Sequence, residues 1–272
     1  MSYADPKTLV ETQWLAEHLD DPQLRIIQMD MNSEAYDKEH IPGSILWTIF
    51  TLLQPDLKIL DPKAMSKLLS DSGIERDTVV VAVHNSSPTS GWIFWLLKLC
   101  GHQDIKILNG GCPKWQRSNL PLTIDKTEVM PTNYHIDEYN NCLRVFATDV
   151  KEFVEKDRIL LDVRSDQEYR GEIYLLEPPK AGEKAGHIPG AINIDYELAH
   201  NEDGTFKSAD ELQKIYGELI SSDKEIVPYC AIGARSAHTW FVLKYLLGCD
   251  RVKNYDGSWN EWSMLADAPV TN

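Results

Sequence analysis

One short stretch of the chain combines a thiol, a glycine and an arginine. It covers residues 229–236 and reads Tyr-Cys-Ala-Ile-Gly-Ala-Arg-Ser. An apolar run at residues 225–229 leads into Cys230, and apolar side chains at helical spacing follow Ala234 and end before Gly248. The pattern predicts a strand, a short loop and a helix over residues 234–247. Cys230 would then lie at the end of the strand, where the loop leads into the helix.

This placement predicts a nucleophilic cysteine. The first amides of a helix have no partner inside the helix, and the helix dipole is positive at that end, so both favour a thiolate. Gly233 lets the loop turn back, so that several N–H groups point inward, and Arg235 adds a cation with a planar donor fork. The alternative is a buried and inert cysteine, which is common for this residue type.

The neighbouring glycine and arginine favour chemistry over inertness. We therefore predict that Cys230 is the catalytic residue and that the loop after it binds a thiolate, a persulfide anion or an oxyanion. The predicted binding residues of this loop are Ala231, Ile232, Gly233, Ala234, Arg235 and Ser236.

The chain contains the same unit twice. The sequence His-Ile-Pro-Gly occurs at residues 40–43 and again at 187–190, and the expected strands and helices follow the same order around both copies. We expect an α/β fold with two tandem domains, each a mostly parallel sheet with helices on both faces. The expected boundaries are 1–122 for the first domain, 123–141 for a polar linker and 142–272 for the second domain.

The repeat separates scaffold from chemistry. His40 and His187 precede matching Pro-Gly turns in both halves, so we interpret them as turn-fixing residues. Where the second half has residues 230–235, the first half has His84 followed by polar residues, without a cysteine or an arginine. We predict that the first domain is catalytically silent.

Two arginines upstream of the second His-Ile-Pro-Gly turn have no counterpart in the first half. Arg164 and Arg170 lie in a connection that is longer than its first-half counterpart, and extra loop length often has a function. We predict that both bind substrate. An equally supported alternative is that they form ion pairs with Asp162, Asp166 or Glu172.

Composition narrows the class of protein. The chain has 272 residues, of which 43 % are hydrophobic, and this suffices for two ordinary domains. The net charge of −15 disfavours nucleic acids and anionic membrane surfaces as partners. No apolar run is long enough to cross a membrane, and no secretory signal is expected at the start. The five cysteines are irregularly spaced, so we expect no disulfide framework, no metal site and a cytoplasmic location.

The other cysteines are weaker candidates for chemistry. Cys100 and Cys249 are expected at helix C-termini, where the helix dipole disfavours a thiolate. Cys112 follows a Gly-Gly turn and is expected to be partly exposed, and Cys142 falls next to the linker.

Three reactions suit a cysteine inside a ring of amides at a helix N-terminus. They are sulfur transfer, phosphate-ester hydrolysis and arsenate reduction. Four residues separate Cys230 from Arg235, whereas a loop that surrounds phosphate or arsenate is one residue longer. The tighter loop favours a single sulfur atom carried on Cys230. A phosphatase-like hydrolase and a persulfide carrier or sensor without efficient turnover stay open as alternatives.

The motifs together resemble the rhodanese-type sulfurtransferases, and most closely the two-domain bacterial thiosulfate sulfurtransferases. The resemblance rests on the tandem unit, the two His-Ile-Pro-Gly turns, Asp162-Val-Arg164, the segment from Glu168 to Gly171, the Cys230 loop and the segment from Asn254 to Trp259. It implies two tandem rhodanese-like domains, of which only the second is catalytic.

The resemblance also implies a mechanism. The Cys230 thiolate would take the outer sulfur of a donor such as thiosulfate, release sulfite and hold a persulfide. Cyanide, a small thiol or a protein thiol would then accept the sulfur, without a cofactor or metal. Many thiosulfate-using members have a basic residue after the cysteine, where this chain has Ala231 and Ile232, and vertebrate members have an arginine in place of Glu168. We expect thiosulfate as the donor, and these departures leave 3-mercaptopyruvate as the alternative.

Overall fold

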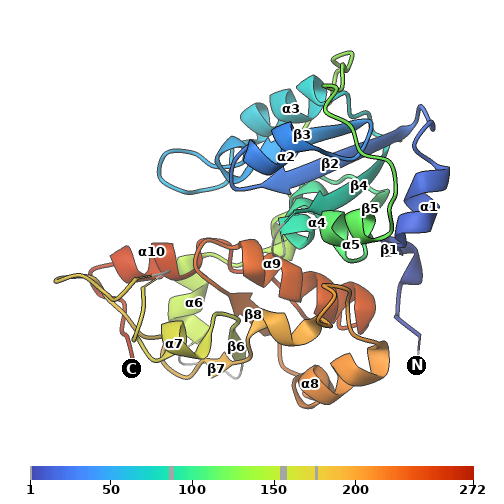
Figure 1. The fold of residues 1–272 in the computed structure, drawn as a ribbon. Coiled ribbons are helices and arrows are strands. Elements are labelled where there is room, and N and C mark those ends of the chain that lie inside the picture. Colours follow the sequence, from blue (N-terminus) through green and yellow to red (C-terminus); the bar gives the residue numbers. More distant parts are fainter. Residues whose placement is uncertain (1, 86–88, 154–157, 175–176) are drawn as a thin grey trace. The chain divides into compact units, whose positions relative to one another are not determined.

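The computed structural model describes residues 2–85, 89–153, 158–174 and 177–272 (Figure 1). These residues form two compact units. The N-terminal unit consists of Pro6–Asn140 with His200–Phe206, and the C-terminal unit consists of Met1–Asp5, Asn141–Ala199 and Lys207–Asn272. Two short segments therefore belong to the unit that is built mainly from the other half of the chain.

The N-terminal unit contains a five-stranded parallel sheet in the order β1-β5-β4-β2-β3. Its strands are β1 (Leu9–Val10), β2 (Leu24–Asp30), β3 (Ser44–Thr48), β4 (Val79–His84) and β5 (Ile105–Leu108). Its helices are α1 (Thr12–Glu17), α2 (Glu34–Lys38), α3 (Pro62–Asp71), α4 (Thr89–Leu99) and α5 (Gly111–Arg117), with 3-10 turns at Pro6–Thr8 and Ile49–Thr51. The successive residues Ile26 and Ile27 are both buried, so both faces of the sheet are covered.

The C-terminal unit repeats this order. Its parallel strands β6 (Ile159–Asp162), β7 (Ile192–Asn193) and β8 (Ile226–Tyr229) are arranged β7-β6-β8. Isolated parallel bridges from Ile226 to Val252 and from Arg144 to Asn254 extend the order beyond β8. The helices are α6 (Ala147–Phe153), α7 (Asp166–Tyr169), α8 (Ala209–Ser221), α9 (Ala234–Phe241) and α10 (Ser258–Met264), with 3-10 turns at Asn141–Leu143 and Tyr196–Ala199. The expected α/β class with two tandem parallel-sheet domains is confirmed.

The helix predicted over residues 234–247 has two parts. It is α-helical over Ala234–Phe241 and π-helical over Val242–Leu246, and it ends before Gly248, whose φ is +74°. The Leu247 N–H bonds the Val242 carbonyl five residues earlier. Residue spacing alone did not reveal this change of pitch, because one π turn shifts the apolar stripe by less than one residue position.

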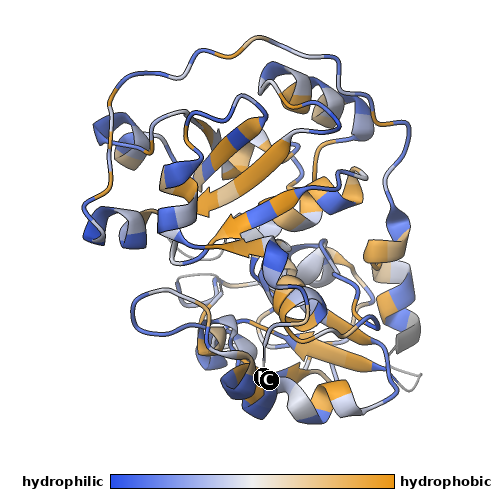
Figure 2. Cartoon of the chain, turned by 90° about the vertical axis from the view of Figure 1, so that its right-hand side faces the viewer, coloured by the Kyte–Doolittle hydropathy of each residue, from blue (hydrophilic) through white to orange (hydrophobic). Residues whose placement is uncertain are grey.

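Hydrophobic residues fill the space between sheet and helices in each unit. Figure 2 shows the strands as mainly hydrophobic and the connecting loops as mainly hydrophilic. In the C-terminal unit the buried core includes aromatic side chains that flank the predicted loop. This core comprises Val145, Val150, Leu160, Ile188, Ala191, Val227, Tyr229, Tyr255, Trp259, Trp262 and Ala268. No helix among the described residues has the length and apolar character needed to cross a membrane.

The two His-Ile-Pro-Gly turns have the same construction. His40 and His187 are buried, and the imidazole rings stack on Tyr36 and Tyr169 with centroid distances of 3.8 and 3.7 Å. In each case Nδ1 lies within hydrogen-bond distance of the carbonyl oxygen of the same tyrosine, at 2.7 and 2.9 Å. Both histidines are therefore committed to the scaffold, as the turn-fixing interpretation expects.

Candidate active site

Cys230 follows directly after β8, and Gly233 caps the N-terminus of α9. Gly233 has φ of +90°, and a Cβ at this position would lie 2.6 Å from the carbonyl oxygen of Asp256. Only glycine fits, because both the backbone conformation and the close approach exclude a side chain. The predicted strand, loop and helix are therefore present, with the cysteine at the end of the strand.

Hydrogen-bond donors surround the Cys230 sulfur. The Gly233 N–H donates to Sγ at 3.2 Å, and the hydroxyl oxygens of Ser236 and Ser258 lie 3.6 and 3.9 Å from it. Each hydroxyl can also donate to a backbone carbonyl, Gly233 at 3.1 Å for Ser236 and Tyr255 at 2.8 Å for Ser258. The proton of each serine can therefore turn to the sulfur when charge develops there.

A second segment of the C-terminal unit fixes the loop through hydrogen bonds. The Cys230 N–H donates to Ser258 Oγ at 3.0 Å, and the Trp259 and Asn260 N–H groups donate to the carbonyls of Cys230 and Ala231, each at 2.9 Å. The Asn254 amide also donates to the Gly233 carbonyl at 3.3 Å. We define residues 254–260 as the support segment, because Asn254, Ser258, Trp259 and Asn260 all bond the loop.

Ser258 itself is under backbone strain. Its φ is +54°, in the left-handed region that residues with a side chain rarely adopt. This conformation allows its hydroxyl to face Cys230. The site residues predicted from the sequence did not include Ser258, although the segment that contains it was part of the family resemblance. Its distance from Cys230 along the chain left no local signal.

The support segment is anchored by a buried ion pair. Arg144 donates to both carboxylate oxygens of Asp256, with Nε 3.0 Å from Oδ1 and with Nη2 bonded to Oδ2. Burial raises the pKa of Asp256 to about 6, although Arg144 opposes the shift. The carboxyl group adjoins the backbone that contacts Gly233, so its state bears directly on the loop.

Arg235 is held by a carboxylate. Its Nη1 and Nη2 atoms donate to the two Glu168 oxygens at 2.7 and 2.8 Å, and Glu168 is only 3 % exposed. Burial by itself would raise the pKa of Glu168, but the hydrogen bond and charge of Arg235 lower it overall. Burial by itself would lower the pKa of Arg235, but the hydrogen bonds that it donates to Glu168 and its electrostatic interactions with Cys230 and Glu168 raise it above its ordinary value.

Arg164 and Arg170 each have a carboxylate partner. Arg164 is buried, bonds Asp162 with Nη2 2.6 Å from Oδ2, and also donates to the Gly186 carbonyl at 2.7 Å. Arg170 is exposed and pairs with Asp166 at 3.0 Å. These contacts are the ion pairs that the alternative interpretation named. A substrate-binding role stays a prediction for both arginines, and the Arg164 side chain is only 2 % exposed.

The remaining loop residues contribute backbone N–H groups to the site and only small or apolar side chains. Ala231 and Ala234 are buried and Ile232 is partly buried. None of these small and apolar side chains carries a positive charge that could bind an anionic sulfur donor. Any anion at this loop therefore depends on amides, hydroxyls and Arg235.

The other thiols differ from Cys230 in their surroundings. Cys100, Cys112 and Cys249 are buried, and Cys142 is exposed. Cys112 was expected to be partly exposed, but it is only 4 % exposed because it packs in the core beside Trp115, so that expectation was wrong. Burial raises the pKa of Cys100 to about 12 and also raises that of Cys112. In the described part of the chain, no group of three or more His, Cys, Asp or Glu side chains could hold a metal ion.

His84 lies at the position in the N-terminal unit that corresponds to Cys230. It ends β4, is buried, and has Nδ1 3.0 Å from Ser90 Oγ. Burial lowers its pKa to about 4, so the imidazole is neutral at pH 7. Residues 86–88 of the corresponding loop lie outside the described residues. The absence of chemistry in this unit stays a prediction.

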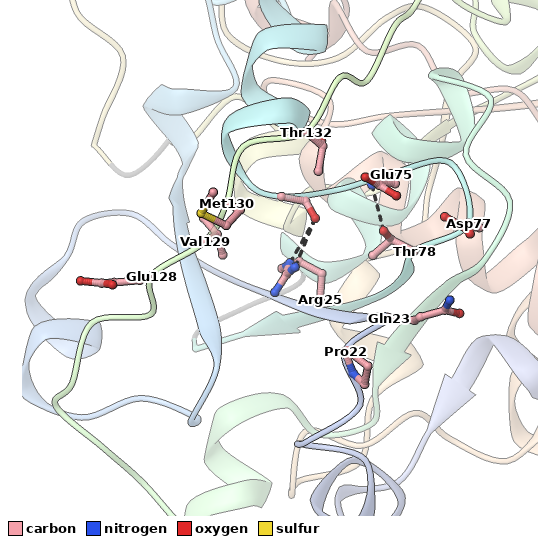
Figure 3. A pocket seen from close by; sticks show the side chains of 11 residues that line it. Pro22, Gln23, Arg25, Glu75, Asp77, Thr78, Glu128, Val129, Met130 and Thr132 are labelled. Carbon is pink, nitrogen blue, oxygen red and sulfur yellow. Dashed lines mark hydrogen bonds between the residues drawn. The ribbon is translucent and has the colours of Figure 1, made fainter.

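A pocket of about 380 Å³ lies in the N-terminal unit at the opposite end of the strands (Figure 3). Arg25 lies at its centre and donates to the Gly73 carbonyl at 3.2 and 3.4 Å. The pocket is at the N-terminal ends of β2 and β4, whereas ligands of parallel sheets bind outside the carboxyl ends. No thiol lines it, so it offers no sulfur chemistry. Its lining residues are Pro22, Gln23, Arg25, Gly73, Glu75, Asp77, Thr78, Glu128, Val129, Met130 and Thr132.

Comparison with known proteins places this geometry in context. The model of the rhodanese-like domain matches twice, at residues 11–118 and 146–265. The sulfur carrier protein TtuD of Thermus thermophilus is 43 % identical, with 99 % of this chain and 98 % of that protein covered. A protein of Mycolicibacterium smegmatis, provisionally named thiosulfate sulfurtransferase, is 42 % identical, with 96 % of each chain covered.

A solved structure shares the fold. The persulfide form of the enzyme EanB with ergothioneine superposes with a TM-score of 0.87 at 24 % identity, covering 99 % of this chain and 71 % of that one. At this identity the likeness concerns the fold alone. The two family matches span most of the chain and include the Cys230 loop and the support segment. The chain therefore belongs to the rhodanese-like family and consists of two copies of its domain.

Proposed function

We propose that the protein is a sulfurtransferase that carries a sulfane sulfur as a persulfide on Cys230. The observation that carries the proposal is the position of the sulfur, which accepts the Gly233 amide at 3.2 Å beside the N-terminus of α9. Two serine hydroxyls within 4 Å add further donors. Such donors stabilise a negative charge that moves between the sulfur and an atom bound to it.

The proposed reaction has two steps. In the first, the Cys230 thiolate attacks the outer sulfur of thiosulfate, the sulfur–sulfur bond of thiosulfate breaks, and sulfite leaves with the electron pair. In the second, an acceptor such as cyanide or a thiolate attacks the outer sulfur of the persulfide and regenerates the Cys230 thiolate. Charge balances in both steps, and no electron donor or proton donor is required. The expected kinetics are ping-pong.

The donor and acceptor belong to this proposal. Thiosulfate appears in the provisional names of relatives that are about 40 % identical over nearly their full length, and 3-mercaptopyruvate is the alternative donor. A small thiol, a protein thiol or cyanide is the proposed acceptor. None of these steps calls for a cofactor. We place the reaction in the cytoplasm, because the thiols of Cys230 and of the acceptor are kept reduced there.

A sulfur carrier is the second candidate function. The relative TtuD is named a sulfur carrier protein. A carrier would form the same persulfide but pass it to one protein thiol, with slow turnover toward small acceptors. Steady-state rates with cyanide separate the two, because an enzyme turns over many times and a carrier releases little more than one sulfur per chain.

Intact-protein mass spectrometry tests the proposal. The protein is mixed with thiosulfate, and separately with 3-mercaptopyruvate, and the gain of one sulfur atom is measured. We expect the gain in the unmodified chain and in Cys142→Ser, which removes the exposed thiol, but not in Cys230→Ser. No gain with either donor in a folded protein would overturn the proposal, and a gain that persists in Cys230→Ser would move it to another thiol.

A further inference from the structure

Three arginines near the Cys230 loop in the described part of the chain each have a carboxylate partner within the C-terminal unit. Arg235 is held by Glu168, Arg164 by Asp162, and Arg144 by Asp256. Each of these arginines contacts the loop or its neighbours, since the Arg164 guanidinium lies 4.6 Å from the Trp259 ring centroid and Asp256 adjoins Gly233. The three ion pairs therefore bring no net positive charge to the loop.

The local balance is in fact negative. Asp195 is half-buried, and both Arg235 and Glu168 act on it electrostatically, so it lies in the same field. Its carboxylate has no arginine or lysine partner among the ion pairs of the described residues. The chain as a whole carries −15. An incoming anion thus meets a loop whose one cation is already neutralised.

We propose that Glu168 is a specificity-determining residue that sets which sulfur donors Cys230 accepts according to their charge. By occupying both outer nitrogens of Arg235, it withholds the cation from the donor. Uncharged organic polysulfides would react best, monoanions such as 3-mercaptopyruvate less well, and the dianion thiosulfate least well. This ranking of sulfur donors rests on the proposed function.

Glu168 also has a structural contact that a test must separate from its charge. Its Oε2 accepts from the Ser165 N–H and hydroxyl, both at 3.1 Å, and the Ser165 hydroxyl caps α7 in return. Glutamine has the same shape and keeps an amide oxygen for Ser165, but it carries no charge. Glu168→Gln therefore removes the charge with little change to the cap.

Paired alkylating agents measure the effect without any sulfur transfer. Iodoacetamide is neutral and iodoacetate is anionic, and both lose the same leaving group to the same thiolate. The ratio of their rates at Cys230, followed by peptide mass spectrometry, cancels the fraction of thiolate and reports the local charge. The exposed Cys142 in the same protein provides the reference ratio.

We expect the iodoacetate-to-iodoacetamide ratio at Cys230 to rise about tenfold in Glu168→Gln, the size expected for one unit charge near a protein surface. The ratio at Cys142 should not change. Arg235→Gln should lower the ratio at Cys230, because Glu168 is then left without its cation. Asp166→Asn is the matched control, since it removes an exposed carboxylate of the same helix that pairs with Arg170 instead.

An unchanged ratio in folded Glu168→Gln, or an equal rise in Asp166→Asn, would overturn the inference. If Glu168→Gln does not fold, Ser165→Ala and a salt titration decide. Ser165→Ala keeps the charge and should leave the ratio unchanged, and added salt should raise the ratio at Cys230 more than at Cys142. The opposite result in either experiment would refute the inference.

The donor preference is then measured directly. The second-order rate constant for persulfide formation from thiosulfate should rise in Glu168→Gln. The rate constant for attack of Cys230 on an uncharged dialkyl trisulfide, which leaves a mixed disulfide on Cys230 and releases an alkyl persulfide, should change less than about twofold. If alkylation is charge-selective but no donor transfers sulfur, the proposed function fails while the assigned role of Glu168 in charge selection survives. If sulfur is transferred but alkylation shows no charge selection, the proposed function survives and the assigned role of Glu168 fails.

Discussion

At the scale of single residues, the loop depends on the close approach of two backbones. Gly233 brings its own N–H to 3.2 Å from the Cys230 sulfur, while the Asp256 backbone occupies the space that a Cβ at this position would need. A larger residue would have to move either the support segment or the loop. The geometry that stabilises an anionic sulfur is therefore fixed by the absence of one side chain.

The first prediction concerns Gly233→Ala. The added Cβ would lie 2.6 Å from the Asp256 carbonyl oxygen at a φ of +90°. We expect the rate of persulfide formation to fall at least about tenfold and the free energy of unfolding to fall by about 1–3 kcal/mol. Stopped-flow kinetics with thiosulfate and urea unfolding measure the two effects.

Gly182→Ala is the matched control for this change. Gly182 has nearly the same φ, +91°, but nothing lies within 4 Å of its added Cβ. It should cost only the conformational penalty of about 1 kcal/mol and leave persulfide formation unchanged. Equal losses of rate in the two variants would show that the contact with Asp256 does not position the loop.

Local pattern predicted the nucleophile but not its partners. Cys230, Gly233 and Arg235 stand together in the sequence, so their spacing was enough to predict the loop. Glu168 and Ser258 lie far away along the chain, and only the fold brings them to the loop. Because Arg235 is paired with Glu168, its positive charge is neutralised and is not free for a substrate. No periodicity or motif spacing encodes such a contact.

At the scale of elements, the site is the junction of β8, α9 and the support segment. Pro228 lies within β8, and its carbonyl still accepts from the Tyr255 N–H at 3.1 Å. The strand therefore tolerates a proline next to its end. The sequence predicted β8 and α9 from apolar runs, but the support segment is irregular and has no period that could identify its contacts.

The second prediction concerns the ion pair that anchors the support segment. Asp256 has a pKa of about 6 in the folded protein, above the ordinary value of 3.8. The folded state therefore binds this proton more tightly than the unfolded state does, and the free energy of unfolding gains a favourable contribution as pH falls through about 6. The Asp256→Asn variant cannot gain this contribution, because asparagine does not bind the proton.

We expect the difference in unfolding free energy, unmodified chain minus Asp256→Asn, to increase by about 1 kcal/mol between pH 7 and pH 5. Urea unfolding at both pH values measures it. Asp166→Asn, which removes an exposed carboxylate of the same unit, should show little change in the corresponding difference. Parallel curves for the unmodified chain and Asp256→Asn would mean that this carboxyl group titrates alike in the folded and unfolded states.

At the scale of the whole molecule, each unit includes a short segment from the other half of the chain. Met1–Asp5 belongs to the C-terminal unit, and His200–Phe206 belongs to the N-terminal unit, where the Phe206 N–H donates to the Asn109 side chain at 3.0 Å. The internal repeat predicted where the two sheets would be. It did not predict this exchange, because Leu53 and Ile59, which form the same antiparallel bridge in the first half as His200 and Phe206 in the second, stay in their own unit.

The third prediction concerns the segment at the start of the chain. The Ala4 and Asp5 N–H groups donate to the carbonyls of Leu246 and Tyr245 at 3.0 and 2.8 Å, and the Tyr3 hydroxyl donates to the Lys207 carbonyl at 2.8 Å. The bonds of Ala4 and Asp5 satisfy backbone carbonyls at the C-terminal end of the helix that begins at the Cys230 loop. Deletion of residues 2–5 should therefore destabilise the C-terminal unit by about 1–3 kcal/mol while it leaves the N-terminal unit unchanged.

Hydrogen exchange followed by mass spectrometry resolves the two units. Amides of residues 242–249 should exchange faster in the deleted chain, and amides of β2 in the N-terminal unit should exchange at the original rate. Because α9 holds the loop at its other end, the rate of persulfide formation on Cys230 should fall along with this protection. Unchanged exchange at residues 242–249 would mean that solvent replaces the lost bonds at no cost. Equal acceleration in β2 would mean that the segment stabilises the whole chain, whereas the contacts of Tyr3, Ala4 and Asp5 are made to the C-terminal unit.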